Sequence, residues 1–109
     1  MFPLGGRDER HELTDHFLAF ANPTRLRILE RLSDAGEVSV NDLAVHLRMS
    51  QPRISWHLRM LRVGGEVRTR REGRQVYCSL DVDNIARERA RLDELIGIKQ
   101  TQVRKEVGA

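Results

Sequence analysis

The spacing of apolar residues changes along this 109-residue chain, and that change limits the secondary structure the chain can form. In the first part of the chain, apolar residues recur at helical spacing, so that they line one face of a helix. From Glu66 to Leu80 they alternate with polar residues around Glu72-Gly73, a pattern typical of a β-hairpin. The sequence therefore predicts a mainly α-helical fold with one small β-hairpin.

Capping residues divide the helical part of the pattern into about five helices. Asn, Ser and Asp accept hydrogen bonds from the free N–H groups of a first helical turn, and Pro fits there because its missing N–H is not needed. The segment Ser39-Val40-Asn41-Asp42 matches a capping box. The expected starts, in chain order, are His11, Asn22-Pro23, Ser39, Ser50 and Asp83.

The length of the chain supports one hydrophobic core and therefore one domain. Residues 1–10 include proline and glycine and are expected to form a flexible arm, residues 11–98 the domain, and residues 99–109 a frayed tail. The lone cysteine, Cys78, excludes a disulfide within the chain and is expected to pack rather than react. No stretch approaches the roughly 20 apolar residues of a membrane helix, so we expect a cytoplasmic protein with no membrane partner.

The positive charge is concentrated in one segment. Residues 48–74 contain eight Arg and two Glu, a net charge of +6, whereas residues 1–47 carry −3 and residues 75–109 carry a net charge of zero. The planar fork of N–H donors on Arg suits phosphate oxygens and guanine edges. A solvated charged surface would give the same composition, so charge alone does not establish nucleic-acid binding.

Three neighbouring features together indicate DNA binding. Two short helices are joined by a tight turn at Arg48-Met49. The second helix, Ser50–Arg62, places Ile54, Leu58 and Leu61 on its inward face and leaves its polar side outward. A hairpin with arginines near its tip follows. This combination describes a winged helix-turn-helix with a two-stranded wing, whose second helix fits the roughly 12 Å wide major groove.

The chain resembles the ArsR/SmtB family of bacterial winged-helix repressors from Phe17 to Leu80. Four motifs in the same order carry the resemblance. They are Ala21–Leu29, Ser39–Ala44, Ser50–Leu58 and Arg70–Tyr77. The resemblance implies a homodimer in which the first and last helices of both subunits pack together, so that two recognition helices face a palindromic operator in double-stranded DNA.

On this interpretation the recognition helix and the wing supply the DNA contacts. The candidates for base edges are Gln51, Arg53, Ser55 and Trp56, because Gln suits adenine and Arg suits guanine. The expected phosphate contacts are Arg59, Arg70, Arg71 and Arg74. Ser50 and Pro52 complete the predicted DNA-binding set. His57 lies at the edge of the inward face and is expected to be a partly buried packing residue.

The two terminal helices carry more apolar surface than one small domain can cover from within, which independently favours a dimer. The predicted interface residues are Leu13, Phe17, Phe20, Leu92, Leu95 and Ile96.

The metal sites known in this family do not carry over to this sequence. Ser39-Val40-Asn41 replaces a Cys-Val-Cys site, and no histidine follows His57 to form a zinc site on the last helix. His11 and His16, with carboxylates close by, remain as a non-standard candidate site for nickel or zinc. Their spacing of five residues aligns them poorly on one helix, so the alternative is two surface histidines.

The sequence favours a sequence-specific dimeric regulator, expected to repress a small operon. The alternatives are an accessory DNA binder with little sequence preference and a protein-interaction module without an effector site. An enzyme is not expected, because no nucleophile lies with a base and an orienting acid, and no glycine-rich phosphate loop is present. Glu66 remains unexplained by the sequence, since relatives place an apolar residue at the start of the wing.

Overall fold

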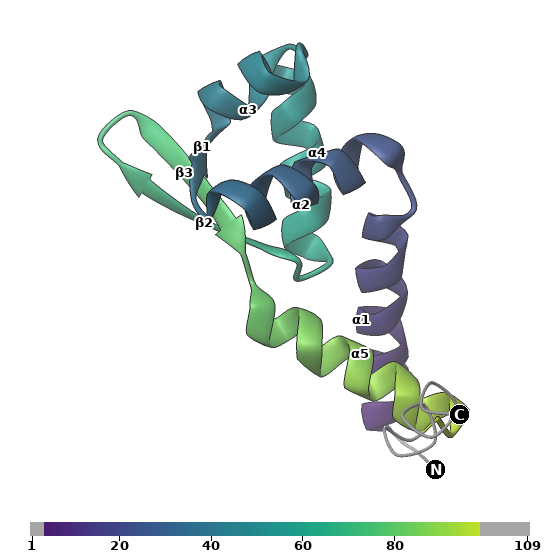
Figure 1. The fold of residues 1–109 in the computed structure, drawn as a ribbon. Helices are drawn as coiled ribbons and strands as arrows, with labels where there is room; N and C mark the ends of the chain where they lie inside the picture. Colours follow the sequence, from purple (N-terminus) through teal and green to yellow (C-terminus); the bar gives the residue numbers. More distant parts are fainter. Residues whose placement is uncertain (1–3, 99–109) are drawn as a thin grey trace.

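The computed structural model describes residues 4–98, which form five helices and a three-stranded sheet (Figure 1). In chain order these are α1 (Leu4–Phe20), α2 (Pro23–Ala35), β1 (Val38–Ser39), α3 (Val40–Leu47), α4 (Gln51–Val63), β2 (Val67–Glu72), β3 (Gln75–Leu80) and α5 (Val82–Ile96). The expected winged helix-turn-helix is therefore confirmed. The tail expected at 99–109 lies outside the described residues.

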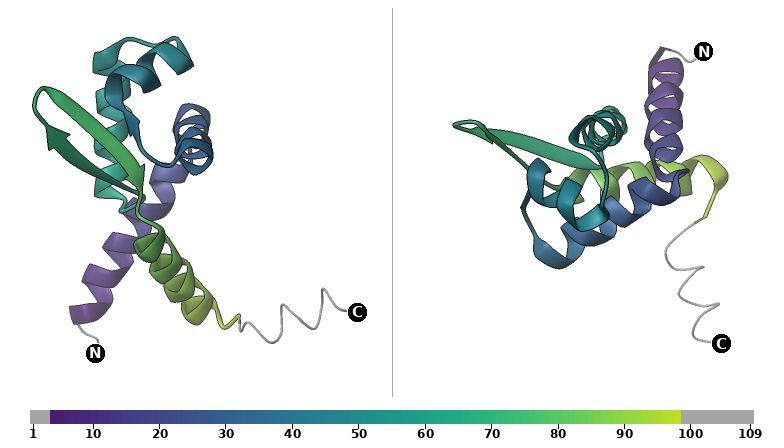
Figure 2. Two further views of the ribbon diagram at one scale, coloured as in Figure 1. Left: turned by 60° about the vertical axis from the view of Figure 1, so that its left-hand side comes forward. Right: turned by 90° about the horizontal axis from the view of Figure 1, so that it is seen from above.

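The elements separate into a head and a pair of longer helices. In the head, α2, α3 and α4 pack together beside the sheet, and the β2–β3 hairpin projects from them as the wing (Figure 1). The helices α1 and α5 extend away from the wing and contact each other, as the further views show (Figure 2). The head and the helix pair are joined where α1 packs against α2 and α4.

The core fills the space between the helices of the head. Ile28, Leu32, Leu43, Ile54 and Leu61 are each at most 1% exposed. Burial of one such side chain contributes about 1.5–3 kcal/mol, so this cluster is a main source of stability. The inward positions expected on the fourth helix are thus confirmed. Two further members, Val67 and Cys78, come from the wing strands and fix the hairpin against the helices.

The wing is a hairpin in a sheet of one more strand than the sequence predicts. Strands β2 and β3 pair antiparallel from Val67↔Leu80 to Glu72↔Gln75, and Gly73 adopts a φ of 62° in the turn. This positive φ suits glycine and confirms the expected turn after Glu72. The short β1 pairs with β3 on the other side. Two residues are too few to show an alternating pattern, which is why the sequence does not reveal this strand.

Three of the expected helix caps are confirmed and one is wrong. The side chains of Asn22, Ser39 and Ser50 each accept a hydrogen bond from the backbone N–H three residues later. For the last helix the cap is Asp81, whose side chain accepts from the N–H of Asn84, instead of the expected Asp83. Both aspartates are suitable caps, and the end of β3 at Leu80 selects the earlier one.

The first helix begins at Leu4, so it includes residues that were expected to form a flexible arm. The expected boundary after Arg10 is wrong because the prediction relied on apolar spacing and on glycine, which costs about 1 kcal/mol in a helix. Arg7, Glu9 and Arg10 are good helix formers and need no apolar spacing to extend the helix. None of the described helices is both long and apolar enough to cross a membrane.

Candidate nucleic-acid interface

The helix α4 presents a solvent-exposed face beside the wing. Its inner residues are committed to the core, while the predicted contact residues Gln51, Pro52, Arg53, Ser55, Trp56 and Arg59 are all exposed. Trp56 is 52% exposed. A large indole left half in water forgoes part of its burial energy, which is unusual for a surface with no binding role. The structure therefore brings together the residues expected on this face.

The first turn of α4 is fixed by side chains from two directions. The Ser50 hydroxyl accepts a hydrogen bond from the N–H of Arg53, and the Gln51 amide donates to the side-chain oxygen of Asn41 on α3. Pro52 lies in the first turn, where it needs no hydrogen bond. Ser50 thus has a structural role as a cap, in addition to its predicted place at the interface.

A cleft of about 270 Å³ lies between α3, α4 and the wing. Arg59 and Arg62 line it from α4, and Arg74 and Gln75 line it from the hairpin. Three guanidinium groups in one concave surface suit a backbone of phosphates. Arg62 is absent from the predicted set, although its position three residues after Arg59 places it on the same helical face.

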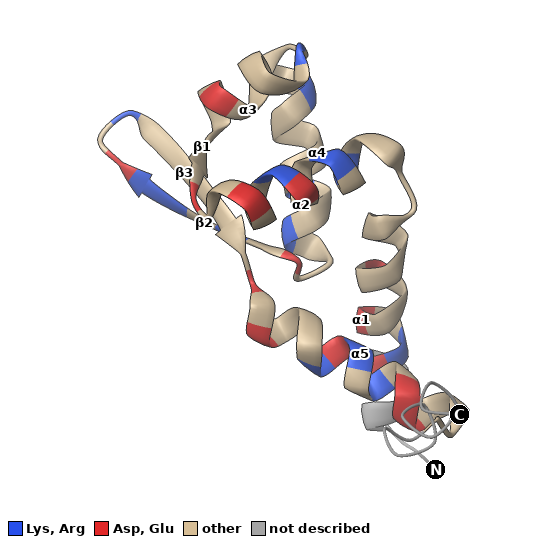
Figure 3. Ribbon diagram, in the orientation of Figure 1, with Lys and Arg blue, Asp and Glu red and all other residues tan. Residues whose placement is uncertain are grey.

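Basic residues make up much of β2 and the turn of the wing (Figure 3). The wing arginines differ in their surroundings. Arg71 and Arg74 are exposed near the tip. Arg70 is held by both carboxylate oxygens of Glu37, at 2.9 and 2.8 Å, and by Glu72 at 2.8 Å, and it lies 4.6 Å from the centre of the Tyr77 ring. The hydrogen bond from Arg70 lowers the pKa of Glu37. Arg70 is therefore occupied within the chain.

His57 is buried on α4, as expected for a packing residue. Burial is the main cause that lowers its pKa, and the positive charges of Arg25 and Arg53 lower it further. The imidazole is therefore neutral at neutral pH, and it contributes no charge to the exposed face of the helix.

The terminal helices place the predicted interface residues in two environments. Leu13 is buried within the chain, and Phe17, Phe20 and Leu92 are half-buried. Leu95 and Ile96 are more than half exposed. A cleft of about 520 Å³ follows α5 beside them, lined by Ala86, Ala90 and Ile98 among others. Of the predicted interface residues, the two near the end of α5 are therefore the most exposed in one subunit.

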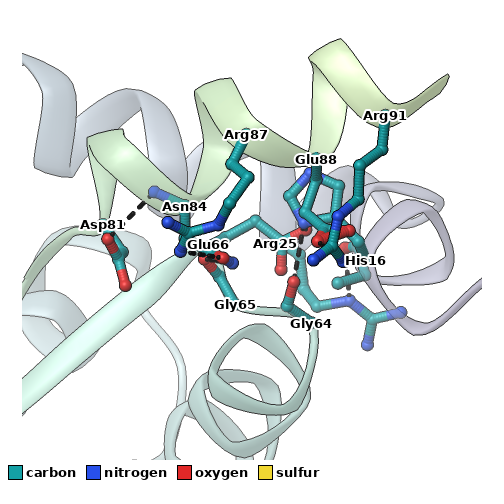
Figure 4. Close-up of polar contacts among 11 residues, drawn as sticks. His16, Arg25, Gly64, Gly65, Glu66, Asp81, Asn84, Arg87, Glu88 and Arg91 are labelled. Atoms are coloured by element: carbon teal, nitrogen blue, oxygen red, sulfur yellow. Dashed lines mark hydrogen bonds and ion pairs between the residues drawn. The ribbon is translucent and has the colours of Figure 1, made fainter. Parts of the chain in front are cut away.

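His16 does not lie on the surface with His11, as the metal prediction requires. The His16 ring is fully buried, and its Nδ1 lies 2.6 Å from the Gly64 carbonyl oxygen and 2.9 Å from the Glu66 carboxylate (Figure 4). A ring nitrogen that faces two acceptors carries the hydrogen, so Nδ1 donates. His11 is exposed. In residues 4–98 no three His, Cys, Asp or Glu side chains are placed to hold a metal ion.

The structure explains why the acidic residue Glu66 lies at the start of the wing. It is fully buried at the start of the wing, where it faces His16 of α1, and Glu88 of α5 is buried close by (Figure 4). Burial raises the pKa of Glu66 to about 8; the Glu88 carboxylate raises it too, whereas the backbone and the charge of Arg25 oppose the rise. Sequence reasoning misses this contact because its partners are far apart in the chain.

Comparisons with known proteins agree with this geometry. The family model described as bacterial regulatory protein, arsR family, matches residues 22–67. The chain is 40% identical over 73 residues to the transcriptional repressor SmtB homolog of Synechocystis sp., covering 67% of this chain and 54% of that protein. It is 42% identical over 86 residues to the biofilm growth-associated repressor of Agrobacterium fabrum, covering 78% and 73%.

A solved structure extends the comparison to the fold. The homodimeric winged helix-turn-helix DNA-binding domain of a possible ArsR-family regulator from Mycobacterium bovis superposes with a TM-score of 0.63 at 27% identity, covering 89% of this chain and 91% of that one. By contrast, the chain spans only about half the length of the SmtB homolog. Two of the relatives named here are repressors, and the third is a possible transcriptional regulator.

Proposed function

Because the chain belongs to the ArsR family of bacterial regulatory proteins, we propose that it is a homodimeric, sequence-specific repressor that binds operator DNA through α4 and the wing. The proposal rests on the difference between the two faces of α4. Its inner face is fixed in the core, and its outer face exposes Gln51, Arg53 and Trp56 beside an arginine-lined cleft. A rigid helix with a polar outer face is the element that reads the major groove.

The contacts on α4 divide into two kinds by their chemistry. Gln51 suits adenine, Arg53 suits guanine, and the Trp56 indole offers apolar contact to a thymine methyl group or a sugar. Arg59 and Arg62, with the wing arginines Arg71 and Arg74, suit phosphates and set the position of α4 along the groove. The specificity of the protein then rests on a few side chains of one helix.

A second copy of the chain completes the site. The apolar surface of α5, continued by α1, is the surface on which two subunits would pack, as the homodimer of the Mycobacterium bovis relative suggests by analogy. Two-fold symmetry then places two α4 helices roughly 34–36 Å apart, or a multiple of that distance, which matches successive major grooves of a palindromic operator.

The test is a binding comparison between two duplexes. One is the duplex that the wild-type protein enriches from a random library, and the other has the same composition in scrambled order. We expect the protein to prefer the enriched duplex roughly thousandfold. Arg53→Ala and Trp56→Ala should each weaken binding to it by about tenfold or more. Arg27→Ala, which changes an exposed arginine of α2, is the matched control.

The alternatives give different results in the same experiment. Equal affinity for both duplexes, with the same salt dependence, would identify an accessory binder without sequence preference. No affinity for any duplex, with Arg53→Ala and Trp56→Ala without effect on cellular activity, would identify a protein-interaction module. A reporter gene placed behind the DNA upstream of the chain's own gene tests repression: its expression should fall when the protein is present.

A response to nickel or zinc stays a prediction, and no step of the proposed mechanism depends on it. His16 is enclosed by Gly64 and Glu66, and His11 is exposed on a different side of α1, so the two histidines do not fit one metal site within a subunit. The measurement is the affinity for the enriched duplex with added nickel, added zinc or a chelator. An affinity that is the same with nickel, with zinc and with the chelator would contradict the predicted metal response.

A further inference from the structure

Arg25 is a buried charge where three helices meet. It lies in the first turn of α2 and is only 9% exposed. Among the described residues no carboxylate lies within ion-pair distance of its guanidinium group. A buried arginine without such a partner needs other acceptors, because an unpaired buried charge is costly. The groups that surround Arg25 therefore indicate what it does.

On one side Arg25 binds the end of α1. Its Nε donates to the Ala19 carbonyl oxygen at 2.9 Å, and one terminal nitrogen donates to the Leu18 carbonyl oxygen at 3.4 Å. Both carbonyls lie in the last turn of α1, where the helix dipole favours a positive charge. The guanidinium group is thus anchored on backbone that belongs to a different helix from its own.

On the other side Arg25 reaches the recognition helix α4. Its second terminal nitrogen lies 3.5 Å from Nδ1 of His57, and its central carbon lies 5.7 Å from the centre of the Trp56 ring. The Trp56 and His57 rings meet edge to face, with their centres 5.1 Å apart. A guanidinium group at this distance from an indole is within the range of a cation–π contact. Arg25 therefore connects the end of α1 to two neighbouring side chains of α4.

We infer that Arg25 is a positioning residue for DNA recognition: anchored on the end of α1, its guanidinium group holds the half-exposed Trp56 ring in the orientation that contacts DNA. The inference rests on the proposed function, since it assigns Trp56 to the DNA interface. A side chain fixed before binding loses less conformational freedom when the complex forms, so its contact contributes more to affinity.

The planar fork of arginine suits this role better than the single amine of lysine. Arg25 uses separate nitrogens for Ala19, Leu18 and His57 while its flat face approaches Trp56. A lysine at this position would keep the positive charge and could reach one carbonyl, but it could not bridge the two helices in this way. Arg25→Lys should therefore retain part of the effect and Arg25→Met none.

The test uses Trp56 as its own probe, because it is the only tryptophan in the chain. In the protein without DNA, fluorescence anisotropy and acrylamide quenching report how mobile and how accessible the indole is. We expect mobility and quenching to rise in the order wild type, Arg25→Lys, Arg25→Met. Arg27→Met, on the exposed side of the same helix, should match wild type. Circular dichroism confirms that each variant is folded.

The second measurement is DNA affinity. For the duplex enriched by wild type, Arg25→Met should lose about tenfold in affinity and Arg25→Lys less, while affinity for the scrambled duplex stays near that of wild type. A role confined to folding would lower the melting temperature and leave both Trp56 signals and the affinity of the folded variant unchanged. If Arg25→Met does not fold, Arg25→Lys decides both measurements.

The outcomes separate this inference from the proposed function. Trp56 signals equal to those of wild type in the folded Arg25 variants would overturn the inference, even where wild type binds its duplex. A wild-type protein that binds no duplex overturns the proposed function and the DNA part of the inference with it. A loss of duplex binding in Trp56→Ala without any loss in the Arg25 variants would leave the function standing and reject the positioning role.

Discussion

Burial changes the acid–base chemistry of individual side chains in this protein. Glu66, His57 and Cys78 are each at most 7% exposed. Burial disfavours the charged form, so it raises the pKa of Glu66 to about 8 and that of Cys78 to about 11, and it lowers the pKa of His57. The shifts of Glu66 and Cys78 each give a residue-level prediction of how stability or reactivity depends on pH.

Glu66 should make the protein less stable as pH rises. Its pKa is about 8 in the folded chain against an ordinary 4.5, so the folded state keeps a proton that the unfolded state loses. The stability from this group is fully present below pH 4.5 and is lost as pH rises through about 8. At pH 9, Glu66→Gln should therefore be more stable than wild type by roughly 2–4 kcal/mol.

Urea unfolding at pH 5, 7 and 9 measures this effect. The difference between Glu66→Gln and wild type should grow with pH, because glutamine keeps an acceptor for His16 without a charge. Glu30→Gln, at an exposed carboxylate of α2, is the control and should show no such trend. A difference that stays constant across the three pH values would contradict the buried, neutral state of Glu66.

Cys78 should be unreactive while the protein is folded. Its thiol is fully buried, and burial raises its pKa to about 11, so very little reactive thiolate forms near neutral pH. Ellman's reagent at pH 8 should react with the folded protein only as fast as it unfolds, and immediately in urea. Cys78 is the only thiol in the chain, so the signal is unambiguous. Fast reaction in the folded state would argue for a redox role.

At the scale of elements, a charged side chain of the wing is paired with a carboxylate from another part of the chain. Glu37 lies in the connection before β1 and holds Arg70 through both carboxylate oxygens. DNA phosphates would compete with Glu37 for the same guanidinium group, because a carboxylate and a phosphate can each accept two parallel hydrogen bonds from it. The predicted phosphate contact of Arg70 therefore requires that this pairing opens.

Glu37→Gln should increase DNA affinity by weakening two of the three carboxylate contacts that hold Arg70, so that only Glu72 still pairs with it through a charge. We expect a gain of about twofold to fivefold at low salt and a salt dependence steeper by about one phosphate contact. Asp34→Asn is the control, because it removes an equal charge from an exposed position near the end of α2. The prediction is measured by fluorescence anisotropy of a labelled duplex across a salt series. Equal gains in both variants would mean that only net charge matters.

At the scale of the whole molecule, the proposed function assigns separate tasks to the helix pair and the head. In that proposal α1 and α5 pack against a second subunit, while α4 and the wing, which contact DNA, lie at the other side of the molecule (Figure 2). The two parts are joined where α1 packs on α4 and His16 contacts Gly64 and Glu66 just after the end of α4. In the proposed dimer, the distance between the two α4 helices would therefore be set by how the helix pairs associate.

Ile96→Glu should convert the proposed dimer into monomers. Ile96 is 57% exposed in one subunit, and a carboxylate there would be buried against the partner at a cost that association cannot recover. Sedimentation velocity measures the mass, and the same variant should lose about a hundredfold in affinity for a duplex with two half-sites. Val45→Glu, at an apolar residue of α3 that is more exposed, should leave the mass unchanged. A wild-type monomer would contradict the interface.

The local pattern of residues was sufficient to predict most elements and the exposed face of α4. Apolar spacing located the inward residues Ile54, Leu58 and Leu61, and caps such as Asn22 and Ser50 located helix starts. These signals lie within one or two turns of chain, so they need no knowledge of the fold. The interpretation of His16 was wrong for a different reason. Its position three residues after Leu13 and four before Phe20 places it on the inward face of α1, but the prediction judged it by its metal-ligand chemistry.

The sequence by itself therefore determined the order of helices, the hairpin and the amphipathic division of α4, since periodicity and capping act between near neighbours. Only the tertiary structure decided which distant groups meet: His16 with Glu66, Arg70 with Glu37, and Arg25 with Trp56. Such pairs depend on how the helices and the sheet pack in three dimensions. The members of each pair are tens of residues apart in the chain, so no pattern of neighbouring residues predicts that they meet.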